Sequence, residues 1–449
     1  MIARWFPPDR TRELLALGVP ILLGMLSQTV LNLVDTAMVG RLGPAPQGAA
    51  GLGSFSFWVL ANLIIGVGTG VQAIVSRRDG EGDPEGAGAA LDTGLILAFV
   101  VGLPLGYGLA TAAPQFFTLL SDDAEVVAGG SGYLAIRLMS VGVVAANYCF
   151  RGFFNGIGQS RVYMSTIAIS HVANVFLNWV FIYGNLGAAP MGVRGAALAS
   201  VLATVLATCL YTGLALARPE VRNRYRPFRF ASLSGPRLRA LVALSWPEAV
   251  RGIGLMLGYL LFLRLHAELG TRAVAAGTIL VNLASTGFLP ALGIGLACST
   301  MMGRHLGRGE PDVARDFAWL GVRVAVAGLA LPALGAALFA EPLLGLFTQD
   351  ALVIAAAKPA LQLFAVSVVV DALPMVLIFS LLGAGATRFV AGVQMAQQYL
   401  LMLPLAWLLG IGFDLGVFGM WVAMFLSRIA VAGIAVRKLR GDSWTRIAV

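Results

Sequence analysis

The chain has 449 residues, of which 58% are hydrophobic and only 12% are charged, and its mean hydropathy is +0.84. Soluble domains carry about 25% charged residues, so the composition excludes a soluble protein and predicts a polytopic α-helical membrane protein. A net charge of +9 would suggest nucleic acid as a partner of a soluble protein. The distribution of arginines between the loops explains that charge by orientation in the membrane, and no nucleic-acid partner is expected.

Apolar segments long enough to cross a bilayer as a helix recur twelve times along the chain. They are predicted at 14–39, 47–76, 87–113, 126–150, 160–184, 192–217, 240–265, 272–303, 314–339, 351–382, 388–411 and 415–436.

The first of these segments carries one carboxylate, Asp35, and a proline, Pro20, at which the helix can bend. Gln28, Asn32 and Asp35 follow at spacings of four and three, so they share one face. An ionisable residue at such depth costs about 3 kcal/mol unless it faces a polar cavity or is protonated. Two interpretations stay open: Asp35 lines a water-accessible cavity and exchanges a proton or a cation, or it lies at the outer membrane surface.

The fifth segment adds polar side chains at helical spacings, namely Ser170, His171, Asn174 and Asn178. One interpretation is a hydrated pocket in which these amides hydrogen-bond the carboxylate of Asp35, the nearest unpaired acid of the same half. The other is that they tie neighbouring helices together, as Asn and Ser commonly do in membranes.

The two halves of the chain are repeats related by a shift of 227 residues. The shift aligns Pro20 with Pro247, Gly66 with Gly293, Gly82-Asp83-Pro84-Glu85 with Gly309-Glu310-Pro311-Asp312, and GIGQSR (156–161) with GAGATR (383–388). Six helices per half is an even number, so both halves run in the same direction across the membrane. The predicted fold is therefore all-α, with twelve transmembrane helices in two six-helix bundles related by a pseudo-twofold along the membrane normal.

The domain division follows from this repeat. We predict an amino-terminal lobe at 1–217, a basic cytoplasmic linker at 218–239 and a carboxy-terminal lobe at 240–449. Arginines concentrate in the amino-terminal tail, the even-numbered connections and the carboxy-terminal tail. By the positive-inside rule both termini are cytoplasmic.

The second half keeps polar side chains at the place that corresponds to the fifth segment. The shift puts Gln397 and Gln398 on its serine and histidine, with Gln394 one turn away, whereas Asp35 maps onto Phe262. A neutral polar face is therefore predicted there, without the acid of the first half.

A different carboxylate, Asp371, lies deep in the tenth segment. Its role stays open between function and simple pairing with Arg264 or Arg251. Glu248 and Arg251 are three residues apart and are predicted to neutralise each other in a structural ion pair.

Metal, cofactor and enzyme signatures are missing from the sequence. The three cysteines lie singly in apolar segments, without CxxC spacing or a histidine cluster. A Walker lysine motif, a nucleophile elbow and an HExxH motif are all absent. We therefore predict no metal site, no disulfide, no cofactor and no enzyme activity.

The ordered motifs resemble the multidrug and toxic compound extrusion (MATE) family, in its bacterial DinF-like branch. They are NLVDTAMVGRLG (32–43), the G-x-G…R…G-[DE]-P-[ED] pattern at 66–85 and 293–312, NGIGQSR with its echo GAGATR, and HVANVFLN (171–178). The resemblance covers the chain from about residue 10 to 437.

The resemblance implies a secondary transporter that expels organic cations, drugs or metabolites in exchange for protons or sodium ions. It implies that Asp35 is the coupling acid, in a pocket with Asn174 and Asn178, and that an asparagine at 178 weakens the case for sodium. Asp371 matches an acid found on the tenth helix of some relatives, but Leu255 stands where those relatives carry a second acid. Coupling through the carboxy-terminal lobe is therefore in doubt.

The expected partners are a small, cationic substrate and the lipid bilayer. We expect a monomer in the bacterial inner membrane. A lipid-linked oligosaccharide flippase of a related transporter family is the alternative function.

Overall fold

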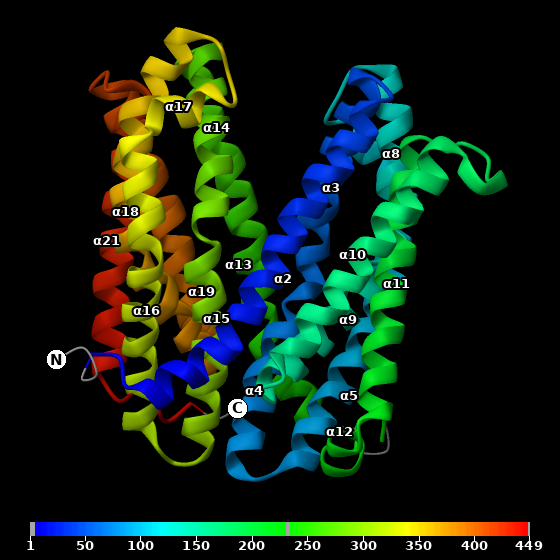
Figure 1. Ribbon diagram of the computed structural model, residues 1–449, viewed down its shortest axis with the longest axis vertical. Coiled ribbons are helices and arrows are strands. Elements are labelled where there is room, and N and C mark those ends of the chain that lie inside the picture. The colour runs from blue at the N-terminus through cyan, green and yellow to red at the C-terminus, as the bar shows by residue number, and fades with distance from the viewer. Residues whose placement is uncertain (1–4, 230–233, 448–449) are drawn as a thin grey trace. The chain divides into compact units, whose positions relative to one another are not determined.

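The computed structural model describes residues 5–229 and 234–447, and within these ranges it contains helices and no strands (Figure 1). Residues 230–233 of the predicted linker 218–239, and Arg4 of the amino-terminal tail, lie outside the described residues.

Each predicted span of the first half corresponds to one helix or to two consecutive helices. The helices are α2 (Pro8–Gly40), α3 (Pro44–Ile65), α4 (Val67–Glu81), α5 (Pro84–Val100), α6 (Gly102–Thr111), α7 (Ala113–Thr118), α8 (Ala124–Met139), α9 (Val141–Gly156), α10 (Ser160–Tyr183), η1 (Asn185–Gly187), α11 (Val193–Ala217) and α12 (Pro219–Arg224).

The second half follows the same order. Its helices are α13 (Gly235–Glu268), α14 (Thr271–Gly287), α15 (Leu289–Gly307), α16 (Pro311–Leu338), α17 (Ala340–Gly345), α18 (Ala351–Gly383), α19 (Thr387–Ala396), η3 (Gln397–Met402), α20 (Leu403–Trp407), η4 (Leu408–Gly412) and α21 (Gly416–Arg440).

Eleven helices of the described residues are long and apolar enough to cross a membrane, and the pair α8 and α9, bent by 50°, makes a twelfth span if it counts as one. This confirms the predicted all-α membrane fold. The pseudo-twofold axis and the lobe boundaries at 217 and 240 stay predictions.

The repeated G-[DE]-P-[ED] motif is a signal that ends one helix and starts the next. Gly82 ends α4 in the left-handed region at φ 74°, where glycine alone is unstrained, and Asp83 caps α5 by accepting a backbone N–H. Pro84 occupies the first turn of α5, where no N–H is needed. Gly309 has the same φ of 74° and Pro311 begins α16. The motif is repeated because the chain must reverse sharply at the same place in both halves.

The chain divides into two compact units, and the division does not fall in the loop between the halves. One unit contains the described residues of 23–252, and the other contains the described residues up to Leu22 and from Ile253 onward. Each boundary cuts a long helix a few residues after its internal proline, Pro20 in α2 and Pro247 in α13. The first segments of α2 and α13 are therefore exchanged between the repeats.

Close packing holds each exchanged segment to its unit. A Cβ at Gly66 would lie 2.7 Å from the carbonyl oxygen of Ser245, so α4 can approach the start of α13 this closely only with glycine. The equivalent Gly293 of α15 lies against α2, where a Cβ would be 3.0 Å from the Cβ of Leu22. The 227-residue shift pairs these two glycines, so both repeats build the same helix contact.

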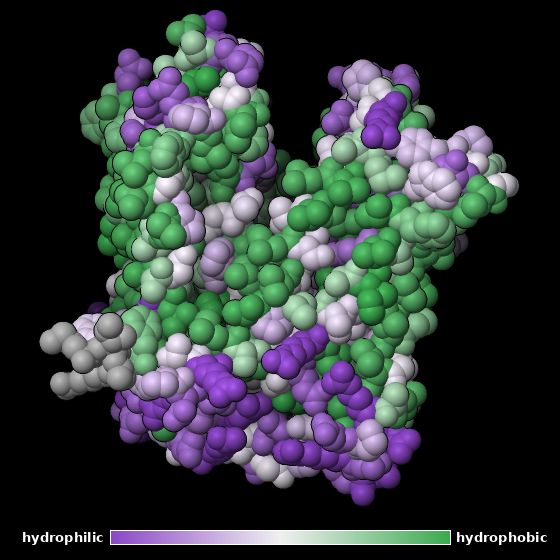
Figure 2. Space-filling model, in the orientation of Figure 1, coloured by the Kyte–Doolittle hydropathy of each residue, from purple (hydrophilic) through white to green (hydrophobic). Residues whose placement is uncertain are grey.

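Polar and apolar residues separate along the helices as a bilayer requires. In the unit that contains α3, α10 and α11, apolar residues cover the middle and polar residues gather at the end where α4, α5 and α12 lie (Figures 1 and 2). This separation fits a helix bundle whose middle contacts hydrocarbon.

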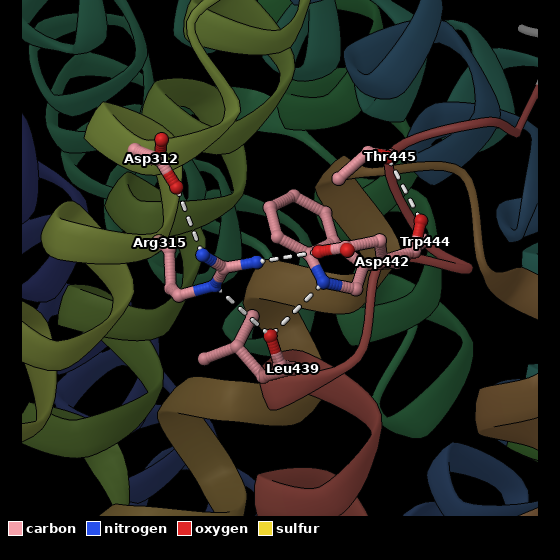
Figure 3. Close-up of polar contacts among 6 residues, drawn as sticks. All are labelled: Asp312, Arg315, Leu439, Asp442, Trp444 and Thr445. Atoms are coloured by element: carbon pink, nitrogen blue, oxygen red, sulfur yellow. Dashed lines mark hydrogen bonds and ion pairs between the residues drawn. The ribbon is translucent and has the colours of Figure 1, made fainter.

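The residues after α21 fold back onto the start of α16 (Figure 3). Arg315 donates from Nη1 to Asp312 at 2.9 Å, from Nη2 to Asp442 at 3.0 Å and from Nε to the Leu439 carbonyl at 3.2 Å. Trp444 is fully buried, donates from Nε1 to the same carbonyl at 3.0 Å, and its ring lies 5.6 Å from the guanidinium. One arginine thus joins the carboxy-terminal segment to α16.

We expect Trp444→Ala to lower the apparent unfolding temperature of the purified protein in detergent, because removing a buried tryptophan costs on the order of 3 kcal/mol. Arg315→Ala should act in the same direction through the lost contacts to Asp442 and Leu439. The control is Arg308→Ala, an exposed arginine at the end of α15, for which a change within about 0.5 kcal/mol is expected. Equal unfolding temperatures for Trp444→Ala and Arg308→Ala would show that the segment is not docked.

Candidate functional site

A carboxylate and two amides meet between α2 and α10. The Asn178 side-chain nitrogen donates to Asp35 Oδ1 at 2.6 Å and lies 3.1 Å from Asn174 Oδ1. Asn178 is fully buried, Asn174 is 2% exposed and Asp35 is partly exposed. The structure therefore brings together the three residues for which the sequence predicts one pocket. Their role in ion coupling stays a prediction.

The amide of Asn174 has hydrogen-bond partners in two orientations. In one, its nitrogen donates to the Ser200 hydroxyl at 3.4 Å. In the other, its nitrogen donates to Asp35 Oδ1 at 3.1 Å and its oxygen accepts the Ser200 backbone N–H at 3.1 Å. In the first orientation the amide oxygen faces Asp35 Oδ1, which is an acceptor when the acid is ionised, and the amide nitrogen faces the Ser200 N–H, whereas the second orientation satisfies both atoms.

A second group of hydrogen-bonded polar side chains joins the same two helices, nearer to the first residue of each helix. His171 Nδ1 lies 2.7 Å from the Ser27 hydroxyl, and His171 Nε2 lies 3.2 Å from Gln28 Oε1. Gln28 in turn donates to Asn32 Oδ1 at 3.0 Å. The predicted residues Gln28, Asn32 and His171 are therefore joined, and Ser27 is a member that sequence reasoning missed, although it directly precedes Gln28.

Ser170 faces a different helix. Its hydroxyl donates to the Ala203 carbonyl of α11 at 2.8 Å. Such a contact ties α10 to α11, which is the second of the two interpretations of the polar residues in this segment.

The buried carboxylate of the second half has a cationic partner. Asp371 of α18 is 1% exposed, and its Oδ2 lies 3.6 Å from Nε of Arg428 on α21. Neither carboxylate oxygen has a hydrogen bond among the described residues. The guanidinium of Arg428 also lies 4.5 Å from the centre of the Phe288 ring, a cation–π contact. The partner of Asp371 is thus Arg428, in place of the Arg264 or Arg251 considered from the sequence.

Arg251 instead pairs with Glu248 on its own helix, as predicted. Its Nε donates to Glu248 Oε2 at 2.8 Å, and its Nη2 contacts Oε1. Both side chains are about nine-tenths buried, so the pair neutralises itself inside α13.

The three glutamines of the second half lie where the eleventh span leaves regular α-helix. Gln397 begins the π-helical segment η3 and donates to Ser427 Oγ at 2.8 Å. Gln398 is 8% exposed and packs against Gly258 of α13, and Gln394 lies one turn earlier in α19. None of the three glutamines donates a hydrogen bond to the carboxylate oxygens of Asp371.

The described residues contain no cluster of three or more His, Cys, Asp or Glu side chains that could hold a metal ion. Buried carboxylates and amides inside repeated bundles of membrane-spanning helices are typical of secondary transporters, in which such groups mark ion and substrate pathways. The fold and the site therefore define the class of the protein as a membrane transporter.

The particular family follows from comparison with known proteins. The family model MatE matches residues 20–180 and 247–408, one match in each half. The chain belongs to the MATE family, as its motifs predict. The members of this family are transporters, so the chain is a transporter and not an enzyme. Its placement in the DinF-like branch stays a prediction.

Curated relatives cover almost the whole chain. The multidrug resistance protein NorM of Vibrio vulnificus is 25% identical over 94% of this chain and 93% of its own length. The multidrug resistance protein MdtK of Pectobacterium atrosepticum is 26% identical over 96% of this chain and 95% of its own. These bacterial relatives and the many spans make the chain a multi-pass inner-membrane protein with small-molecule substrates.

Solved structures share the fold at low sequence identity. A structure described as an outward-facing conformation of a multidrug resistance MATE family transporter has a TM-score of 0.88 and 22% identity, with 96% of this chain and 95% of that chain covered. A MOP superfamily transporter from Pyrococcus furiosus gives the same values.

The pair of Asp371 and Arg428 makes a prediction about stability. Arg428→Leu leaves a buried carboxylate without its charge partner and should destabilise the protein by about 3–5 kcal/mol. Adding Asp371→Asn should restore most of the apparent unfolding temperature. The deficit of the single variant should shrink as the pH falls, because an unpaired carboxylate can take up a proton.

The matched control is Arg440→Leu, an exposed arginine at the end of the same helix. If Arg428→Leu and Arg440→Leu unfold at the same temperature, or if Asp371→Asn does not rescue Arg428→Leu, the two side chains are not coupled.

Proposed function

We propose that this transporter exports small cationic compounds from the cytoplasm in exchange for protons, with Asp35 as the group that takes up and releases the coupling proton. The observation that carries the proposal is the contact of Asp35 with the amides of Asn178 and Asn174. The names of the relatives, multidrug resistance proteins, support drug-like substrates.

The amides suit an acid that changes its charge. When Asp35 is ionised it only accepts hydrogen bonds, and Asn178 and the rotated Asn174 can both donate to it. When Asp35 is protonated its hydroxyl can donate to the oxygen of Asn174 in the other orientation. Both protonation states are therefore satisfied by the same two side chains, which lowers the cost of switching between them.

Coupling then follows from competition. An ionised Asp35 attracts a cationic substrate, and a protonated Asp35 does not, so an incoming proton and an outgoing cation use one group in turn. Bending of α2 at Pro20 would let the helix respond to the change in charge. With cytoplasmic termini, which the arginine distribution favours, Asp35 lies toward the outer end of α2, near the side from which the coupling proton would enter.

The second acid is less suited to coupling. Arg428 already balances the charge of Asp371, so a proton or a cation there must compete with a tethered guanidinium. We propose that Asp371 affects substrate affinity and leaves the proton dependence of transport to Asp35.

Asp35→Asn should abolish proton-coupled transport while leaving expression and membrane insertion intact, because an amide mimics the protonated acid permanently. The measurement is uptake of a radiolabelled ethidium-like cation into inverted vesicles across a series of imposed pH gradients. Asp371→Asn is the matched control, since it also neutralises one membrane-embedded acid, and it should keep the pH dependence of the wild type.

Wild-type transport in Asp35→Asn at neutral pH would contradict the assignment of the coupling acid. Loss of the pH dependence in Asp371→Asn would show that both acids titrate. Movement of a lipid-linked oligosaccharide in place of the cation would favour the flippase.

Asn178→Ala should weaken transport less than Asp35→Asn, because it removes a hydrogen bond worth about 1 kcal/mol and leaves the titrating group. Asn178→Asp should increase the response to an imposed sodium gradient, because a second carboxylate beside Asp35 creates a more anionic site. The control is Ser170→Ala, which removes a polar side chain of the same helix that faces α11. A variant Asn178→Asp indifferent to sodium would argue against the pocket as described.

A further inference from the structure

Arg137 is a cation enclosed by the helices of the unit that contains Asp35. It lies in the last turn of α8 and is 8% exposed. Its guanidinium lies 4.0 Å from the centre of the ring of Phe57 on α3, which is itself fully buried. A cation–π contact stabilises the positive charge but offers no oxygen or nitrogen acceptor to the N–H donors. Phe57 thus fixes the guanidinium and leaves its donors unused.

The donors of Arg137 lack acceptors in the described part of the chain. Nε is enclosed and has no hydrogen-bond partner. The rest of the guanidinium forms neither a hydrogen bond nor a direct ion pair with a described residue. The negative end of the α8 dipole favours a cation in the last turn, but charged groups among membrane helices normally pair with an opposite charge. Such a guanidinium is suited to binding an anion.

A hydrophobic cluster near one end of the unit relates the position of Arg137 to that of Asp35. The cluster consists of Val39, Ala49, Tyr133, Ile182, Val193, Ala196 and Ala197. Val39 follows Asp35 by four residues in α2, and Tyr133 precedes Arg137 by four residues in α8. Residues four apart share one face of a helix. The helices belong to the first and fourth spans, which run in opposite directions, so both charged residues lie one turn from the cluster on the same side of it.

The third helix of the candidate site has the same relation to the cluster. Ile182 follows Asn178 by four residues in α10, and Asn178 donates to Asp35 at 2.6 Å. Arg137 also exerts an electrostatic attraction on the ionised carboxylate of Asp35. The two opposite charges therefore lie in one region of the helix bundle without a direct contact that neutralises them.

A molecule that satisfies both groups carries a cation and an anion. We propose that Arg137 is a specificity-determining residue that binds a carboxylate of the substrate while Asp35 binds its cationic group. The substrate class that uses the whole site is thus a zwitterion. This inference rests on the proposed function, because it takes Asp35 as the group that binds the cation.

The chemistry of arginine suits this role in two ways. Its planar guanidinium can donate two parallel hydrogen bonds to a carboxylate. It also stays charged when Asp35 takes up a proton. The two groups then change from a net charge of zero to an excess of one positive charge, which repels the cationic part of the bound substrate. Arg137 therefore both selects the substrate and helps to release it.

The test is the binding of two rhodamine dyes to the purified full-length protein in detergent at neutral pH, measured by fluorescence anisotropy. One dye has a free benzoate group and is a zwitterion, and the other is its methyl ester and is a cation. Because the dyes differ only in this ester, the ratio of their dissociation constants reports recognition of the carboxylate.

Arg137→Gln should weaken binding of the zwitterion by about tenfold to a hundredfold, because charge-assisted hydrogen bonds to the carboxylate are lost. The ester should bind as it does to the wild type or slightly more tightly, since a cation near Asp35 is removed. Arg137→Lys keeps the charge but not the planar fork, and it should recover part of the loss. A purely structural role of Arg137 would not change the ratio between the dyes.

The matched control is Arg194→Gln. Arg194 is an exposed arginine of α11 that lies beside α8, since a Cβ at Gly132 of α8 would be 2.6 Å from its Nε. Its replacement should change neither dissociation constant.

Asp35→Asn separates this inference from the proposed function. It should weaken binding of both dyes, because both carry the cationic group. Unchanged binding of the ester in Asp35→Asn would contradict the proposed function. Equal losses of both dyes in Arg137→Gln and Arg137→Lys, or no loss of the zwitterion in Arg137→Gln, would overturn the role of Arg137.

Discussion

A polar side chain among membrane-spanning helices is costly unless it finds a partner in the protein, because the hydrocarbon core holds no water to replace one. The molecule meets this constraint with short contacts between helices that are far apart in the sequence. Asn178 of α10 donates a hydrogen bond to Asp35 of α2, and Ser170 of α10 donates one to a backbone carbonyl of α11. The helix bundle and the candidate site are thus held by the same kind of bond, and the site differs in containing an acid.

The two repeats provide different kinds of partner for their membrane-embedded acids. In the first, Asp35 has neutral amides, which can serve a charged or an uncharged carboxyl group. In the second, Asp371 has the permanent cation Arg428, which serves the charged form only. The two halves share the order of their helices but differ in the partner of the acid, and this difference underlies the proposal that Asp35 is the acid that changes its charge.

The sequence predicted what depends on local pattern. Length and hydropathy located the spans, and helical spacing placed Asn174 and Asn178 on one face, where Asp35 was the nearest acid. Arg428 was missed because its partner lies on another helix, and pairing between helices leaves no periodic signal along the chain. The exchange of the first segments of α2 and α13 was missed for the same reason, since both segments read as ordinary parts of long helices.

That exchange bears on how the protein is made. The unit that contains Leu23–Gly252 includes the first segment of α13, which leaves the ribosome only after all six spans of the first half. The start of α2 is synthesised first, yet its packing partners in α15 come much later. The first unit therefore completes its core only when the start of α13 has been made, and the start of α2 must stay in the bilayer without its packing partners until α15 is inserted.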